Sequence, residues 1–181
     1  MAVRAYEGIL PRLQPGVYVD AQALVVGHVE IGRDSSIWPM SVVRGDVNQI
    51  CIGERSNIQD GCVLHVTHDS EYSAGGKPLR VGDDVTVGHR SVLHACTVED
   101  LCLIGMGAIV LDGAVVRRGA LIGAGALVPP EKELEGGYLY LGAPVRQVRA
   151  LSEKEMRYLS YSAEHYVRLK NRHRENGGSA G

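Results

Sequence analysis

The sequence predicts a mainly β fold, a left-handed parallel β-helix of the hexapeptide-repeat type that ends in one α-helix. Three observations predict it. An aliphatic residue recurs every six positions over most of the chain, the 181 residues include no Phe and one Trp, and a capped amphipathic helical pattern follows the repeat near the C-terminus. A core without large rings suits a coil that stacks small aliphatic side chains in layers.

The aliphatic repeat is the strongest of these observations. A step of six matches neither the 3.6-residue period of a helix nor the two-residue period of a strand, but it fits a triangular coil with three six-residue sides. Small residues lie four positions after the aliphatic ones, and Gly often follows them directly, where it permits unusual backbone torsions. A generic β-rich protein with coincidental spacing is the alternative. The repeat runs through Val19, Val25, Ile31, Ile37, Val43, Ile52, Ile58, Leu64, Val81, Val87, Leu93, Val98, Ile104, Val110, Val116, Ile122 and Val128.

The repeat is irregular in three places. The step is nine residues between Val43 and Ile52, seventeen between Leu64 and Val81, and five between Leu93 and Val98. The longest irregularity contains a Gly-Gly-Lys-Pro segment, so we expect residues 66–80 to form a loop that leaves the coil.

We predict four segments along the chain. The β-helix spans 11–130 and stops at two consecutive prolines, a connecting segment spans 131–151, a helix packed along the β-helix spans 152–175, and a disordered tail spans 176–181. The helix begins at a capping box formed by Ser152 and Glu155. Its apolar face consists of Met156, Leu159, Ala163, Tyr166 and Val167.

Composition excludes several classes of function. The net charge of -2, with both signs interspersed, gives no electrostatic footprint for nucleic acid or an anionic membrane. No apolar run approaches the roughly 20 residues of a membrane span, and no signal peptide is evident, so we expect a cytoplasmic protein. The four cysteines form no CxxC pair, which favours reduced, structural thiols over a redox role.

Three of the seven histidines occupy related positions on the sides of the predicted coil, and the other four do not. His65 and His94 each follow the aliphatic residue of the same side, one coil apart, so their side chains should stand about 4.8 Å from each other. His89 lies on a different side and could join them only from a neighbouring subunit of a three-fold ring. Three imidazoles with a fourth position for water are typical of catalytic zinc. Solvated surface histidines are the alternative, and we expect that state for His28, His68, His165 and His173.

The residues around these histidines resemble the active-site series of the γ-class carbonic anhydrases and their close bacterial relatives. The similar segments are Arg44-Gly45-Asp46, Ser56-Asn57-Ile58-Gln59-Asp60, His65, Gly88-His89 and His94, and the resemblance covers nearly the whole chain, including the C-terminal helix. It implies a homotrimer that hydrates carbon dioxide to bicarbonate. The cofactor would be Zn²⁺, although Fe²⁺ and Co²⁺ also accept three imidazoles.

The resemblance also implies roles for individual residues. His65, His89 and His94 would be the zinc ligands, shared between subunits, and Gln59 would orient the hydroxide on the metal. Arg44 and Asp46 would form an ion pair near the site, for which an ordinary surface pair is the alternative. Asn57 and Asp60 would belong to the supporting polar network, and Tyr166 would approach the metal from the helix.

Two features depart from this family pattern. Val47 stands where the family carries an acidic residue, and the loop after His65 is short, which leaves His68, Asp69 and Glu71 as substitutes for a proton-transfer glutamate. Three other functions therefore stay open. They are a hexapeptide acyl-CoA transferase, a thioesterase and a metal-binding scaffold with weak catalysis.

Overall fold

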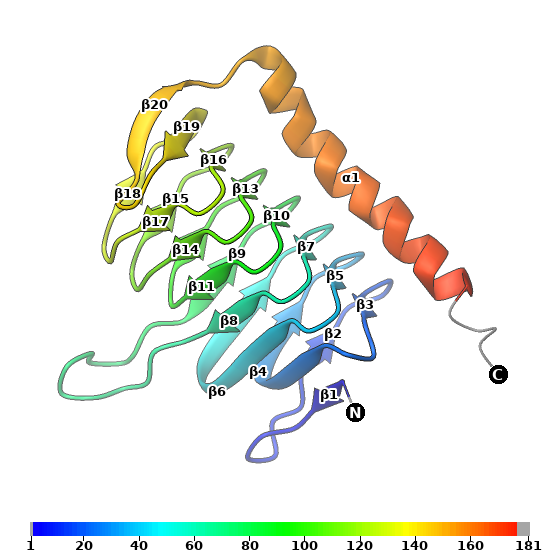
Figure 1. Ribbon diagram of the computed structural model, residues 1–181. Helices are drawn as coiled ribbons and strands as arrows, with labels where there is room; N and C mark the ends of the chain where they lie inside the picture. The colour runs from blue at the N-terminus through cyan, green and yellow to red at the C-terminus, as the bar shows by residue number, and fades with distance from the viewer. Residues whose placement is uncertain (1, 177–181) are drawn as a thin grey trace.

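The computed structural model describes residues 2–176, which form a triangular parallel β-solenoid with one α-helix beside it (Figure 1). The predicted left-handed hexapeptide β-helix with a C-terminal helix is confirmed. Each coil contributes a short strand to each of three sides, and strands of successive coils pair in parallel.

The first side begins each coil and contains β1, β8, β11, β14, β17 and the first halves of the long strands β4 and β6. The second halves of β4 and β6 continue around a corner into the second side. The bounds are β1 Val3–Arg4, β4 Leu24–Ile31, β6 Val42–Ile52, β8 Val63–His65, β11 Val92–His94, β14 Ile109–Val110 and β17 Leu127–Val128.

The second and third sides are built in the same way. The second side contains β2 Arg12–Leu13, β9 Leu79–Val81, β12 Thr97–Val98, β15 Val115–Val116 and β18 Glu133–Leu134. The third side contains β3 Tyr18–Val19, β5 Ser36–Ile37, β7 Asn57–Ile58, β10 Thr86–Val87, β13 Leu103–Ile104, β16 Leu121–Ile122 and β19 Tyr138–Leu141.

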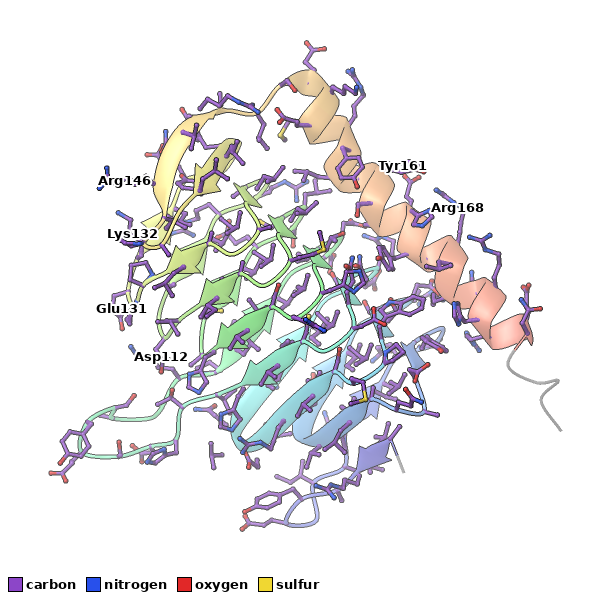
Figure 2. All side chains as sticks on the ribbon, in the orientation of Figure 1. Asp112, Glu131, Lys132, Arg146, Tyr161 and Arg168 are labelled. Atoms are coloured by element: carbon purple, nitrogen blue, oxygen red, sulfur yellow. The ribbon has the colours of Figure 1, made fainter. Side chains whose placement is uncertain are left out.

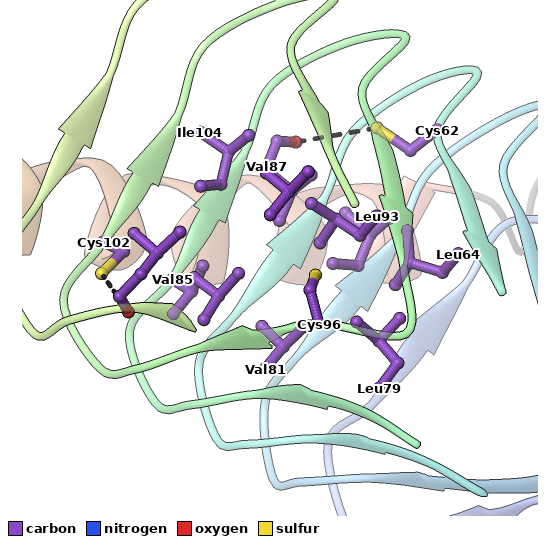
Figure 3. Close-up of a cluster of buried hydrophobic side chains, with 14 of the residues drawn as sticks. Cys62, Leu64, Leu79, Val81, Val85, Val87, Leu93, Cys96, Cys102 and Ile104 are labelled. Carbon is purple, nitrogen blue, oxygen red and sulfur yellow. Dashed lines mark hydrogen bonds between the residues drawn. The ribbon is translucent and has the colours of Figure 1, made fainter. Parts of the chain in front are cut away.

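The aliphatic residues of the repeat fill the interior of the triangle. Leu64, Leu79, Val87, Leu93 and Ile104 are completely buried and belong to one continuous core (Figure 3). Because each residue pairs with its counterpart one coil away, every coil covers the apolar face of its neighbour. The repeat therefore specifies the fold through burial of small side chains.

The small residues of the repeat lie at the corners and bond to the next coil. Ser35, Ser41 and Ser56 donate hydrogen bonds of 2.6–2.7 Å to backbone carbonyls at the corner of the following coil. Cys62 and Cys102 occupy the same repeat position, and their thiols lie 3.1 and 3.2 Å from equivalent carbonyl oxygens. A buried corner carbonyl needs a donor, which explains why small hydrogen-bonding residues recur there.

All four cysteines are free thiols. Burial raises the pKa of Cys62, Cys96 and Cys102 to about 12. Because the thiolate is the reactive form, these three side chains are chemically quiet and serve the core, as the sequence suggested.

The solenoid differs from its predicted bounds at both ends. β1 lies before residue 11, and β18 and β19 complete a further coil within the predicted connecting segment 131–151. Pro129 and Pro130 fall at a corner between β17 and β18, outside the paired strands, and the coil continues past them. The chain then reverses, because β20 (Arg146–Ala150) pairs antiparallel with β19.

The reversal also covers a neighbouring strand. Leu127 on β17 donates its N–H to Gly142 and accepts a hydrogen bond from the N–H of Val145, at 3.0 and 2.8 Å. The last coil thus has backbone partners beyond it on the first and third sides.

The helix α1 (Glu153–Asn176) lies along the third side and differs from the prediction by one residue at each end. The capping box is present, since Ser152 N donates to Glu155 and Glu155 N donates to the Ser152 hydroxyl, at 2.8 and 3.3 Å. Leu159 and Ala163 of the predicted apolar face are buried, whereas Met156 is 38% exposed. Of the predicted tail, Asn176 is helical and residues 177–181 lie outside the described residues. Within 2–176 no helix is both long and apolar enough to cross a membrane.

An ion pair between a buried lysine and a partly exposed aspartate lies at the far end of the helix. Lys170 is fully buried, and its Nζ lies 2.7 Å from Asp34 Oδ1 and 2.7 Å from Asn171 Oδ1. The sequence did not predict this contact, because Lys170 sits in a polar stretch of the helix.

The Lys170 pair predicts a large effect of one isosteric change. Asp34→Asn keeps a residue that tolerates the positive φ at this position but leaves the ammonium without its counter-charge. We expect a loss of about 3 kcal/mol in the free energy of unfolding, measured by urea denaturation. Lys170→Met removes the buried charge as well and should cost clearly less. Equal losses in the two variants would contradict a buried-charge effect.

Candidate metal centre

His65 and His94 end neighbouring strands of the first side and lie in register. β8 pairs with β11 so that His65 is opposite His94. The ring centroids are 5.3 Å apart, and His65 Nδ1 lies 3.2 Å from His94 Nε2. The predicted one-coil relation between these two residues is therefore present in the structure.

The three irregular steps of the sequence all fall at the corner where the two histidines lie. We call this the first corner, and it consists of residues 45–49, 65–78, 94–96 and 111–114, between the first and second sides. Figure 2 shows Asp112 at the edge of the stack where the long loop leaves it. The inserted and deleted residues interrupt the regular turn at this corner, and polar side chains gather there.

A carboxylate holds each of the two histidines. Asp46 Oδ1 lies 3.0 Å from His65 Nε2, and the other oxygen of Asp46 accepts a hydrogen bond from Arg44. Asp112 Oδ1 lies 2.6 Å from His94 Nδ1, and Thr67 donates to the second oxygen of Asp112. Asp112 and Thr67 were not predicted. Their only signal is position, since both lie just after an aliphatic residue at this corner.

The electrostatics of the first corner favour ionised carboxylates. Burial tends to raise the pKa of Asp46, but hydrogen bonds from Arg44 and His65 outweigh it and hold the pKa below its usual range. Burial also opposes ionisation of Asp112, and the bonds from Thr67 and His94 again lower the pKa. Burial lowers the pKa of His65, with Asp46 opposing the shift. A neutral imidazole is the form that binds metal.

His89 lies at a different place, which we call the second corner, between the third and first sides. It comes just after β10, and its Nδ1 is 2.9 Å from Asp60 Oδ2. This corner consists of residues 38–41, 59–62, 88–91 and 105–108.

Gln59 is oriented from the helix side by a buried chain of hydrogen bonds. Its Nε2 donates to Asn57 Oδ1 at 3.0 Å, Asn57 Nδ2 donates to Thr86 Oγ1 at 3.0 Å, and Thr86 Oγ1 lies 2.9 Å from the Ser162 hydroxyl of α1. All four residues are buried. The helix therefore sets the orientation of the Gln59 amide.

Tyr166 lies on α1 near the second corner. Its ring packs edge-on against Trp38, with centroids 5.6 Å apart, and burial together with the charge of Asp60 raises its pKa. Trp38, the only tryptophan, was not predicted as part of the site.

The nine predicted site residues thus form two separate half-sites in one chain. Arg44, Asp46, His65 and His94 lie at the first corner, and Asn57, Gln59, Asp60, His89 and Tyr166 lie at or near the second. Among residues 2–176, no group of three or more His, Cys, Asp or Glu side chains is placed to hold a metal. One described chain therefore keeps His89 apart from His65 and His94.

The His65 and His94 pair fits a tetrahedral metal. Two nitrogens that each lie 2.0–2.1 Å from one zinc are about 3.4 Å apart, close to the observed 3.2 Å. Asp46 and Asp112 accept the N–H of the outer ring nitrogens, so the two inner nitrogens face each other with lone pairs. A cation between them removes that repulsion. His89 follows the same rule, since Asp60 holds its Nδ1 and leaves Nε2 available.

The loop residues considered as possible proton-transfer substitutes lie away from the three histidines in the described chain. His68, Asp69 and Glu71 lie in the exposed part of the loop that projects from the stack between β8 and β9 (Figure 1). Asp69 instead accepts a hydrogen bond of 2.7 Å from the Gly75 N–H. Within the described chain, no contact joins these three side chains to His65, His89 or His94.

Of the other histidines, His28 is exposed, in agreement with a surface position. His165 packs against Tyr161 and Tyr166, with ring centroids 6.0 and 5.6 Å away. His173 contacts Trp38 edge-on at 5.0 Å. His173 is nevertheless exposed, in agreement with a surface position, and His165 is half-buried.

The fold and its paired histidines define a hexapeptide-repeat protein with a candidate metal site. No protein-family model matches the chain. It is 53% identical over 175 residues to protein YrdA of Escherichia coli, across 97% of this chain and 95% of that protein. It is 41% identical over 162 residues to a carbonic anhydrase of Geobacillus kaustophilus, across 90% and 85%. Identity to γ carbonic anhydrase 2 of Arabidopsis thaliana mitochondria is 43% over 161 residues, across 88% of this chain and 57% of the plant protein.

Solved structures support the same fold. A hexapeptide transferase family protein from Anaplasma phagocytophilum matches with a TM-score of 0.86 and 36% identity, over 94% of this chain and 96% of that one. The N-acyltransferase AntD of Bacillus cereus matches with a TM-score of 0.69 and 18% identity, over 88% and 92%, which shows the fold alone. The chain belongs to the γ-class carbonic anhydrase-like family of hexapeptide-repeat proteins.

The lowered pKa of Asp46 predicts a pH-dependent stability in metal-free protein. Ionised Asp46 stabilises the fold above the unfolded-state pKa of about 4, and this contribution is lost as the pH falls through the lower folded-state pKa. Asp46→Asn should therefore be less stable than the parent by a constant amount between about pH 5 and 7, and the difference should shrink below about pH 4. Urea denaturation of both proteins in the presence of a chelator, at a series of pH values, measures this difference in the free energy of unfolding. A difference that grows toward acid pH would contradict the assignment.

Proposed function

We propose that the protein is a γ-type carbonic anhydrase that hydrates carbon dioxide to bicarbonate at a zinc centre shared between subunits of a homotrimer. The observation that carries this proposal is the division of the site into two complementary half-sites. One offers two imidazole nitrogens at the spacing of a single metal, and the other offers one. Relatives named carbonic anhydrase at 41–43% identity point to the same reaction.

The chain's own residues supply binding and orientation in this proposal. His65 and His94 of one subunit and His89 of the next would hold Zn²⁺, with Fe²⁺ and Co²⁺ as other metals that accept this set. When bound there, zinc lowers the pKa of water to about 7 and so supplies a nucleophile at neutral pH. Gln59 has an amide fixed by Asn57 and is suited to orient small molecules by hydrogen bonding.

The remaining charged residues act through the histidines in this proposal. Asp46, paired with Arg44, fixes the outer nitrogen of His65, and Asp60 fixes that of His89. Tyr166 closes the second half-site from the helix side, next to Trp38.

The outer face of the first side supports the trimer. On the first side, the outward residue just before the buried aliphatic position of each strand from β4 onward is itself aliphatic, whereas the matching positions of the second side are mostly polar or charged. Val63 and Ile109 on this face, and Met40 and Met106 at the second corner, are 37–68% exposed in one chain. This apolar face lies between the two half-sites, so covering it with a neighbouring copy would bring the half-sites together. The outward positions compared here are Leu24, Val42, Val63, Val92, Ile109 and Leu127 on the first side. On the second side they are Arg12, Glu30, Cys51, Arg80, Thr97, Val115 and Glu133.

Acyl transfer is the second candidate, because a similar solved structure belongs to a hexapeptide transferase family. Such an enzyme needs one activating histidine and an acyl-CoA, and a zinc-dependent thioesterase would need the same substrate. A weakly catalytic scaffold is the third, because Val47 and the distant loop side chains leave the proton-transfer group of the family without an evident substitute.

The first test is metal content together with activity. Protein purified without oxygen should contain about one metal ion per subunit, and His65→Ala, His89→Ala and His94→Ala should each lose most of it. Carbon dioxide hydration by stopped flow should fall about 100-fold or more in these variants. His68→Ala, a histidine outside the two half-sites, is the control and should keep its metal. Acyl-CoA hydrolysis without hydration on the same preparation would favour the second candidate.

The second test asks whether one site is built from two chains. His89→Ala lacks the second half-site and His94→Ala lacks the first, so each variant alone should be inactive. A trimer refolded from both contains one interface with both half-sites intact, and random 1:1 mixing should restore about one quarter of the sites. Hydration activity and metal content of the mixture measure this recovery. No recovery in a verified mixed trimer would contradict a shared site.

A further inference from the structure

Asp112 is a side-chain contact of His94 that the predicted site did not include. It follows β14, one coil beyond His94, and its backbone is fixed on both sides. Its carbonyl accepts a hydrogen bond of 2.9 Å from Glu131 N, and the N–H of the next residue, Gly113, donates 2.8 Å to the Ala95 carbonyl. The carboxylate therefore has a defined position relative to the His94 ring.

We infer that Asp112 is a positioning residue that fixes the tautomer of His94 for metal binding and ties this histidine to the loop after β8. The inference rests on the proposed metal site. It concerns a residue that acts through His94 and has no contact with substrate.

The chemistry of a carboxylate explains the first part. Ionised Asp112 can only accept, so the 2.6 Å contact requires the proton of a neutral His94 ring to be on Nδ1. The lone pair is then on Nε2, the nitrogen that faces His65 at 3.2 Å. With the other tautomer the same nitrogen would carry a proton and could not bind a metal.

The second oxygen of Asp112 explains the link to the loop. It accepts from the hydroxyl of Thr67, the second residue of the loop. Thr67 also pairs through its backbone with Lys77 at the other end of the loop, at 2.9 and 3.0 Å. Asn48 donates to the Thr67 carbonyl at 3.2 Å. Lys77 forms an ion pair with Glu131, which lies one coil beyond Asp112. One carboxylate thus contacts both the histidine and the base of the loop.

The test compares Asp112→Asn with a matched control. The amide that this substitution introduces can donate to Nδ1, which would allow the wrong tautomer. Long-range ¹H–¹⁵N NMR of the metal-free protein should show His94 as the Nδ1–H form in the parent and a mixture in Asp112→Asn. Zinc affinity, measured by competition with a chelator, should fall roughly 10–100-fold. Glu131→Gln changes an acidic residue one coil beyond Asp112 that contacts the loop and no histidine, so the His94 tautomer and the zinc affinity of this variant should match the parent.

A further variant separates the two parts of the inference. Thr67→Val keeps the shape of the side chain and the Asp112–His94 contact but removes the loop link. It should leave the tautomer unchanged and increase amide hydrogen exchange at 67–77. Unchanged exchange would overturn the loop link.

Other outcomes overturn the main inference or the proposed function separately. An unchanged His94 tautomer in folded Asp112→Asn, or zinc affinity equal to that of the parent, would overturn the role of Asp112 while the metal site stood. Tight zinc binding without hydration by the parent would overturn the proposed function and leave Asp112 in its role. If the parent bound no zinc, the NMR comparison of metal-free proteins would still decide the tautomer.

Discussion

The in-register stacking of the coils is the constraint on which the rest of the structure depends. Strand neighbours in a parallel sheet are about 4.8 Å apart, and each coil repeats the position of the one before it. Any polar residue placed at a corner is therefore one strand spacing from its counterpart. At the first corner this brings Asp46, His65, His94 and Asp112 into one line, which runs across four coils. Ordered imidazoles here are a product of backbone pairing and need no dedicated pocket.

The same constraint separates the half-sites. A triangular coil cannot bring two of its own corners together, so His89 is held away from the other two histidines by the rigid core between them. The first side, which joins the first and second corners, has an aliphatic outer face. Fold, assembly and chemistry are thereby linked, because the surface that would bury apolar area is also the surface that would complete a ligand set.

The sequence predicted the features that follow from periodicity and missed those that follow from side-chain contacts between coils. The six-residue step was sufficient for the coil, and counting along it placed His65 opposite His94. Asp112 and Thr67 could not be found in this way, since a single Asp after Val110 has no distinguishing pattern until the loop is seen to lie beside it. The prolines after Val128 were interpreted as a stop, although the chain turns a corner there and β18 still pairs with β15. The roles of His65, His89 and His94 as ligands stay predictions, since they depend on a metal and a second chain.

The reversal of the chain at β20 has a consequence for the length of the solenoid. A stack of parallel strands has an open end that could accept another coil, from its own chain or from a second molecule, and so invites fibre growth. Here an antiparallel strand occupies the edge of β19, and residues 142–145 occupy that of β17. Further parallel addition is blocked on these two sides. The last coil is therefore protected from end-to-end stacking on these two sides. The aliphatic outer face of the first side is the surface left for contact with another copy.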